Sequence, residues 1–134
     1  MCRALCRMAY FVGLLVPLIA SAQVVTIRLS PVLVRQAAIQ SPLPVYPKTS
    51  IQHAHHGVAV VELLINGSGT TSDIKVLQSP DDAIADSVSA ALKTWRFQPY
   101  TFQGRPTAIR SRFIFYFDLD GSGPHVTDAM RSSF

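Results

Sequence analysis

The sequence has little cysteine, little excess charge and no basic cluster. Its two cysteines, Cys2 and Cys6, both lie within the first 22 residues, so a chain that loses this segment has no thiol and no disulfide. Lys and Arg number 12 against 8 Asp and Glu, for a formal charge of +4 in 134 residues. That balance, without a Lys/Arg cluster, excludes a nucleic-acid-binding tract. One small domain held by its apolar core is therefore expected.

The N-terminal segment has the form of a secretory signal. Its parts are a positive n-region, an apolar stretch and a small-x-small cleavage site: Arg3 with Arg7, Met8 to Ile19, and Ala20-Ser21-Ala22. We therefore predict that residues 1–22 are a signal peptide. The alternative is an uncleaved anchor, for which the apolar run is near the lower length limit and is interrupted by Pro17.

Apolar periodicity in the rest of the chain predicts a small α+β domain. The predicted strands are Gly57 to Ile65, Thr71 to Gln78 and Thr107 to Leu119, the first two joined by a hairpin at Asn66-Gly67-Ser68-Gly69. The predicted helices are a short one from Pro47 to about His53 and a longer one that Ser79 caps and Pro99 stops. We expect two layers, a three-stranded antiparallel sheet packed by two helices.

The two flanks of this domain are predicted to be less regular. Residues 23–42 form an N-terminal strand and linker, because Val24 to Leu29 alternate and Pro31 then breaks the pattern. The domain itself covers residues 43–118. Residues 119–134 are rich in Gly, Ser and charge, which predicts a flexible tail.

The sheet is expected to have one unusual face. The core set of the last strand is Ile109, Phe113, Phe115 and Phe117, and its opposite set is Arg110, Arg112, Ile114 and Tyr116. In the first strand, Val58, Val60 and Leu64 also lie opposite the core set. A sheet with helices on one face usually has a polar second face. We therefore expect a cover for it, either Val24 to Leu29 folding back or a second chain.

Several motifs resemble the C-terminal domain of the TonB family. They are Tyr46-Pro47, Gly57 at the start of the first long strand, Asp73-Ile74-Lys75-Val76 in the second, Trp95-Arg96-Phe97-Gln98-Pro99 at the helix end, and the turn at Gly104. The resemblance covers residues 43–118, and the most specific part of it is the motif that begins at Trp95. It implies a periplasmic, non-catalytic protein-binding module linked to outer-membrane transporters, or an inner-membrane-anchored one if residues 1–22 are retained.

The resemblance also implies a docking surface. In the family the last strand lies at the sheet edge and accepts an extended peptide of the transporter by strand addition. The predicted contacts are Arg110, Ser111, Arg112, Phe113, Ile114, Phe115 and Tyr116, and the two arginines would favour an acidic partner. The alternatives are that these arginines only protect the edge from aggregation, or that the edge pairs two copies in a secreted structural homodimer.

Other chemistry is weakly indicated. His53, His55 and His56 cluster, but their spacing fits no structural zinc pattern. The run that begins at Asp118 imitates an EF-hand loop, yet Ala129 stands where the loop needs a bidentate Glu. Ser, His and Asp occur without a nucleophile motif. We therefore predict no enzyme activity, no cofactor and no metal site.

Overall fold

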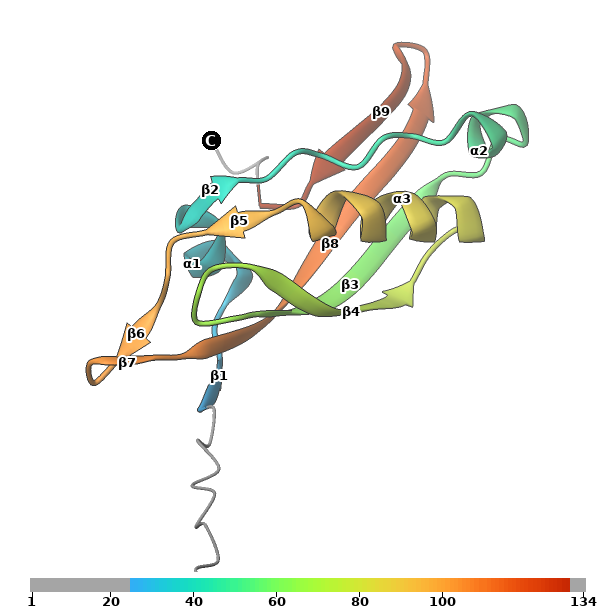
Figure 1. Ribbon diagram of the computed structural model, residues 1–134. Helices are drawn as coiled ribbons and strands as arrows, with labels where there is room; N and C mark the ends of the chain where they lie inside the picture. The colour runs from blue at the N-terminus through green and yellow to red at the C-terminus, as the bar shows by residue number, and fades with distance from the viewer. Residues whose placement is uncertain (1–24, 131–134) are drawn as a thin grey trace, which may run out of the picture.

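A five-stranded sheet built around β8 (Ala108–Asp120) forms one layer of the fold (Figure 1). The structure, a computed structural model, describes residues 25–130, so the predicted signal peptide lies outside the described residues. The remaining strands of the sheet are β1 (Thr26–Arg28), β3 (Gly57–Ile65), β4 (Thr71–Gln78) and β9 (Gly123–Asp128). β3 and then β4 lie on one side of β8, whereas β1 and β9 pair with its other side.

The pairing of β3 with β8 sets the core. The two strands are antiparallel and in register from Gly57 opposite Phe117 to Ile65 opposite Ile109. Alternate residues on the inner face of both strands are fully buried: Ala59, Val61, Leu63, Phe113, Phe115 and Phe117. Burying each of the Val, Leu and Phe side chains in this set contributes roughly 1.5–3 kcal/mol before entropy. The predicted alternation of both strands is confirmed.

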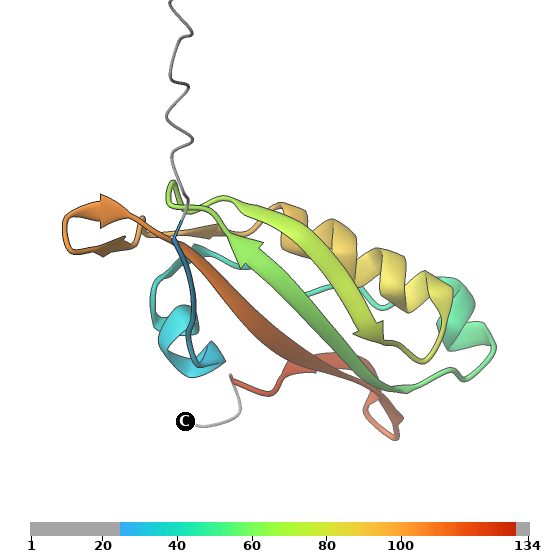
Figure 2. The same cartoon turned by 90° about the horizontal axis from the view of Figure 1, so that it is seen from below.

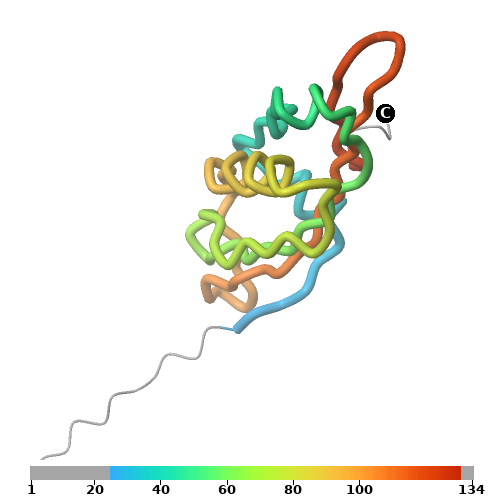
Figure 3. The backbone as a smooth tube through the Cα atoms, turned by 90° about the vertical axis from the view of Figure 1, so that its right-hand side faces the viewer, coloured from blue at the N-terminus to red at the C-terminus, as the bar shows by residue number. Residues whose placement is uncertain are grey.

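The sheet has five strands, so the expectation of three was wrong. β1 runs parallel to β8, with Thr26 opposite Ala108, and β9 forms an antiparallel hairpin with it. Residues 119–128 are therefore largely strand, and the predicted flexible tail is wrong there. The sequence of β9 does not predict this pairing, because the strand is mostly polar and Val126 is the only large apolar residue that it adds to the core. β1 and the β8–β9 turn lie at opposite ends of the sheet (Figure 3).

Residues 25–130 contain three helices where two were predicted. α2 (Lys48–Gln52) and α3 (Asp82–Lys93) correspond to the predicted pair, and α1 (Pro31–Gln36) was missed. α3 lies over the inner face of the sheet (Figures 1 and 2). Its stripe at spacings of four, Ile84, Val88 and Leu92, is fully buried. Among the described residues no helix is long and apolar enough to span a bilayer.

Both ends of α3 differ from the prediction. The cap is Asp81, whose carboxylate accepts a hydrogen bond from the Ile84 backbone N–H at 2.7 Å; the Ser79 hydroxyl instead donates to the Asp81 carbonyl. The helix ends at Lys93, well before Pro99, because the chain turns into a second small sheet there. This sheet pairs β2 (Ala38–Gln40) with β5 (Arg96–Phe97). A third pairs β6 (Thr101–Phe102) with β7 (Arg105–Pro106).

The outer face of the main sheet is open over the described residues (Figure 2). Residues 25–29, the described part of the expected cover, do not fold over this face; β1 within them pairs with β8 in the plane of the sheet. Outer-face apolar side chains such as Val58, Val60 and Ile114 are half-buried by their neighbours, while Tyr116 is 40% exposed.

The hairpin turn between β3 and β4 approaches β5 closely at Gly69. This residue has φ of +87°, a conformation that glycine adopts without strain. Its N–H donates to the Asn66 carbonyl and its own carbonyl accepts from Phe97 N–H at 2.9 Å. A Cβ added at Gly69 would lie 2.0 Å from the Phe97 oxygen. No side chain fits between these two backbones.

We expect Gly69→Ala to destabilise the chain by about 2 kcal/mol or more, since it adds a backbone clash to the cost of positive φ. Urea unfolding measures the change. Gly104→Ala is the matched control, because Gly104 has φ of +74° with nothing within 4 Å of an added Cβ, and it should lose only about 1 kcal/mol. Equal losses in the two variants would show that the contact with Phe97 is not limiting.

Candidate partner-binding site

The predicted docking strand is not at an edge of the sheet. β3 pairs with one side of β8 from Ile109 to Phe117. On its other side β1 covers the first three residues of β8, and β9 covers Phe115 to Asp120. Between them, the Ser111 hydroxyl donates to the Leu29 carbonyl at 3.2 Å. The placement of Arg110 to Phe117 at an open edge is therefore wrong, because both flanks of the chain return to this strand.

The side chains of the predicted site divide between the two faces. Phe113 and Phe115 are fully buried in the core, and Ser111 is buried beside β1. The four that reach the outer face are Arg110, Arg112, Ile114 and Tyr116. Any partner that contacts side chains of β8 in this arrangement must therefore approach over the outer face.

A buried ion pair holds the two covering segments together. Arg35 of α1 lies 3.2 Å from the Asp128 carboxylate of β9, and the two side chains are 12% and 0% exposed. The Arg35 guanidinium also lies 4.8 Å from the centre of the Trp95 ring, a cation–π distance. We call residues 26–36 and 123–128 together the clasp. The two segments of the clasp are thus joined to each other on the inner face of the sheet, and each of them also pairs with β8.

The first family motif anchors the chain before β3. The Tyr46 hydroxyl donates to the His55 carbonyl at 2.6 Å, and its ring meets Phe117 edge-on at 5.3 Å. Pro47 is the N-cap residue of α2. Gly57 begins β3 with φ of +134°. These residues are structural in this arrangement.

The second motif surrounds the centre of the core. Trp95 is fully buried, contacts Phe113 edge-on at 5.1 Å and donates its indole N–H to the Pro42 carbonyl at 2.9 Å. Arg96 bonds the carbonyls of Lys93 and Trp95 at the end of α3. Of the three remaining residues of the motif, Phe97 is buried, whereas Gln98 and Pro99 are exposed.

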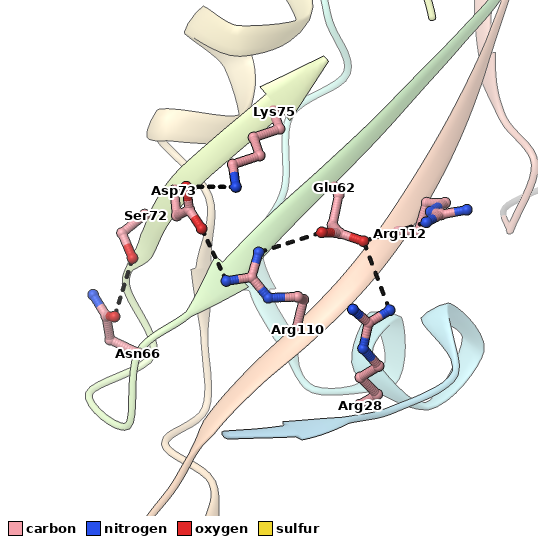
Figure 4. Close-up of polar contacts among 8 residues, drawn as sticks. All are labelled: Arg28, Glu62, Asn66, Ser72, Asp73, Lys75, Arg110 and Arg112. Carbon is pink, nitrogen blue, oxygen red and sulfur yellow. Dashed lines mark hydrogen bonds and ion pairs between the residues drawn. The ribbon is translucent and has the colours of Figure 1, made fainter. Parts of the chain in front are cut away.

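A network of charged side chains crosses the outer face (Figure 4). Its centre is Glu62 of β3, which lies 3.3 Å from both Arg110 and Arg112 of β8 and 3.9 Å from Arg28 of β1. Arg110 also bonds Asp73 of β4 at 2.9 Å. With Lys75, which lies 3.7 Å from Asp73, four cationic side chains face two carboxylates. The group, which we call the arginine network, therefore carries a net charge of +2.

The network stabilises the ionised carboxylates. Burial alone would raise the pKa of Glu62, but hydrogen bonds from Arg112 and Arg110 outweigh it, so the pKa is lowered. The hydrogen bond from Arg110 also lowers the pKa of Asp73. Both carboxylates raise the pKa of Arg110, Asp73 more strongly. All three groups stay charged near neutral pH.

Two hollows lie beside the clasp. One, of about 240 Å³, is lined by Glu62 and the three arginines of the network, together with Leu29, Pro31 and Ser111. The other, of about 280 Å³, is largely apolar and lies between α1 and the small sheet of β2 and β5, with Leu33, Phe97 and Tyr100 in its lining. The first hollow borders Arg112 and Ser111, and so adjoins the stretch of β8 between β1 and β9.

The histidines and the carboxylates near the turns have local partners. His55 Nδ1 lies 2.7 Å from Asp81 Oδ2, whereas His53 and His56 contact the backbone carbonyls of Thr49 and Ala54. In the β8–β9 turn, Asp120 accepts hydrogen bonds from Ser122. Within residues 25–130, no three His, Cys, Asp or Glu side chains are grouped for a metal ion.

Comparisons with known proteins agree on one family. A family model described as the C-terminal region of Gram-negative bacterial TonB protein matches residues 42–119. Protein TonB of Vibrio cholerae is 29% identical over 94 residues, which are 68% of this chain and 38% of the relative. Protein TonB of Pseudomonas aeruginosa is 31% identical over 78 residues, 58% of this chain and 23% of the relative. The chain thus corresponds to well under half the length of either relative.

A solved structure shows the same fold. The solution NMR structure of Pseudomonas aeruginosa TonB CTD superposes with a TM-score of 0.53 at 29% identity, covering 62% of this chain and 85% of that one. The resemblance in the motifs at Tyr46 and Trp95 is therefore confirmed as a relationship of sequence and fold.

We expect Asp128→Asn to destabilise the chain by about 3 kcal/mol, because it leaves the Arg35 charge without its buried counter-ion. Asp118→Asn is the matched control; its carboxylate is 49% exposed on the same hairpin and the change should cost under about 0.5 kcal/mol. Denaturant unfolding compares the two. The double variant Arg35→Met with Asp128→Leu should recover part of the loss, and failure to recover any would argue against the ion pair as the cause.

The Asp81 carboxylate predicts a pH dependence of stability. Burial would raise its pKa, but hydrogen bonds from the Ser50 hydroxyl, the Ile84 N–H and His55 lower it overall. The carboxylate therefore stabilises the fold above the unfolded pKa of about 3.9, and this contribution is lost as pH falls through the lower folded pKa.

We expect Asp81→Ala to lose about 1 kcal/mol at pH 7 as the cap is removed. The difference from the wild type should shrink as the pH falls below about 4, where the unfolded state protonates. Urea unfolding over this pH range measures both effects. Asp81→Asn is the control, since it keeps a capping oxygen without the charge. A loss at Asp81→Ala that is independent of pH would contradict the role given to the ionised carboxylate.

Proposed function

The chain belongs to the TonB C-terminal domain family, and on that premise we propose that it is a non-catalytic protein-binding module of TonB-linked transport in the cell envelope. Its partner in this proposal is an extended segment of an outer-membrane transporter, which adds to β8 as a new strand. The export signal predicted for residues 1–22 supports a periplasmic location, and an inner-membrane anchor if that segment is retained. The proposal rests on the match over residues 42–119.

The clasp determines how a strand can reach β8. The partner must replace β9 along Phe115 to Asp120, or β1 along Ala108 to Arg110. β1 is only three residues long, and β9 has six, two of which are Gly123 and Pro124. Such short segments contribute few net hydrogen bonds of about 0.5–1.5 kcal/mol each. A longer partner strand would form more hydrogen bonds with β8 than β1 or β9 does. We therefore expect the partner to displace one of these two strands when it docks.

The covering segments should lower the apparent affinity for a partner, because only the fraction of molecules with β8 free can bind. The Arg35–Asp128 ion pair joins the two segments of the clasp directly. Weakening this ion pair should raise the fraction of molecules in which β8 is free. The proposal can therefore be tested by measuring how tightly a peptide binds to a variant that lacks the pair.

We expect titration with an extended, transporter-derived peptide to shift the amide NMR signals of β8 and to release those of β9. Asp128→Asn should bind the peptide about tenfold more tightly than the wild type, since it loosens the clasp. Val126→Ala is a milder second variant if Asp128→Asn folds poorly. Asp118→Asn, on the outer face of the same hairpin, should bind as the wild type does.

Unmoved β8 amides at saturating peptide would reject strand addition. A doubling of mass in solution without peptide would instead favour the alternative, a homodimer that uses the same side of β8. In that arrangement β1 or β9 would be exchanged between copies, a route to dimers that short exchanged elements allow. Mass measurement and titration on the same sample separate the two functions.

A further inference from the structure

The arginine network can hold more negative charge than residues 25–130 supply to it. Three guanidinium groups, those of Arg28, Arg110 and Arg112, converge on the single carboxylate of Glu62. Each guanidinium has several N–H donors, whereas Glu62 offers two oxygens. An ion-pair network that served the fold alone would need no such excess of donors.

The exposed fractions separate the arginines by role. Arg110 is 21% exposed and is held between Glu62 and Asp73, so its charge is already paired within the network. Arg28 and Arg112 are 75% and 55% exposed and reach Glu62 at 3.9 and 3.3 Å. These two remain accessible to a ligand from solvent.

The accessible arginines line one hollow. The space of about 240 Å³ bounded by Arg28, Arg112 and Glu62 extends to Pro31 at the start of α1. It is large enough for a carboxylate group. Figure 4 shows Arg28 and Arg112 at the same oxygen of the Glu62 carboxylate, with Arg110 at the other oxygen. A second anion entering here would meet two guanidiniums without displacing Glu62 from Arg110.

An apolar strip continues from the network along the same face. Val60 pairs with Ile114, and Val58 pairs with Tyr116, in the register that follows Glu62 opposite Arg112. These side chains are half-buried except for Tyr116, which is 40% exposed. The outer face thus presents a cationic half and an apolar half side by side.

We propose that this outer face binds an acidic, extended segment of another protein. Its carboxylates lie between Arg28 and Arg112, and its apolar side chains lie along Val60, Ile114 and Tyr116. The charge complementarity of a net +2 surface selects an acidic partner. This site is separate from the strand addition at β8, because a ligand there leaves the clasp in place.

Other occupants fit less well. A second copy of the chain would bring two networks of the same sign together, or set one network on the apolar strip. An anionic membrane attracts roughly 1 kcal/mol per basic residue, so a network whose net charge is +2 would be held weakly. Free phosphate would use the arginines but leave the apolar strip without a role.

The test uses the full chain and a short peptide that alternates glutamate with valine. Arg28→Gln with Arg112→Gln should weaken its binding at least about tenfold, since two charge-assisted contacts are lost. Lys48→Gln with Lys93→Gln removes the same charge at two exposed sites elsewhere and should change the affinity less than about twofold. Tyr116→Ala, at the apolar strip, should weaken binding about threefold.

Amide NMR locates the peptide. The proposal expects shifts at Glu62, Arg112 and Ile114 with β9 unmoved. Release of the β9 signals would place the peptide on β8, which overturns this inference while supporting the proposed function. Equal losses in the two double variants would reduce the effect to overall charge and overturn it. So would inorganic phosphate, or vesicles with anionic lipid, binding at the arginines when the peptide does not.

Discussion

The burial of Trp95 is the interaction on which the rest of the structure depends. Its ring packs edge-on against Phe113 of the central strand, and its N–H reaches the Pro42 carbonyl before α2. Arg35 lies over the ring and continues to Asp128 of β9. One indole therefore brings together the helix end, the central strand and both flanks of the chain. An indole has one donor and a large apolar surface, so a full set of partners is needed when it is buried.

The parts of the fold that the sequence predicts are those whose signal is local and repetitive. The alternation in β3 and β8 and the stripe through Ile84 and Val88 recur over enough residues to define a period. Arg35 and Asp128 show why α1 and β9 escaped prediction. Each is a charged residue in a short element, and a charged side chain is normally exposed. The partner that permits its burial lies 93 positions away in sequence.

The same contrast between local and distant signals explains why only part of the candidate site was predicted. That Arg110, Arg112, Ile114 and Tyr116 share one face follows from the period of two. Whether the strand carrying them is at an edge depends on β1 and β9, whose pairing has no local pattern. Arg28 could not be assigned to the site from sequence either, because it joins Glu62 only through the parallel pairing of β1 with β8. A charge cluster assembled from four strands has no sequence motif.

The shared position of Arg28 couples the two proposed modes of binding. Arg28 belongs to β1, which is part of the clasp, and it also flanks the hollow of the arginine network. A strand that replaced β1 on β8 would remove Arg28 from the network and weaken an acidic ligand there. By linkage, that ligand would weaken the strand to the same degree. A strand that replaced β9 would leave Arg28, Arg112 and Glu62 where they are. Which half of the clasp a partner displaces therefore decides whether the two surfaces compete or act together.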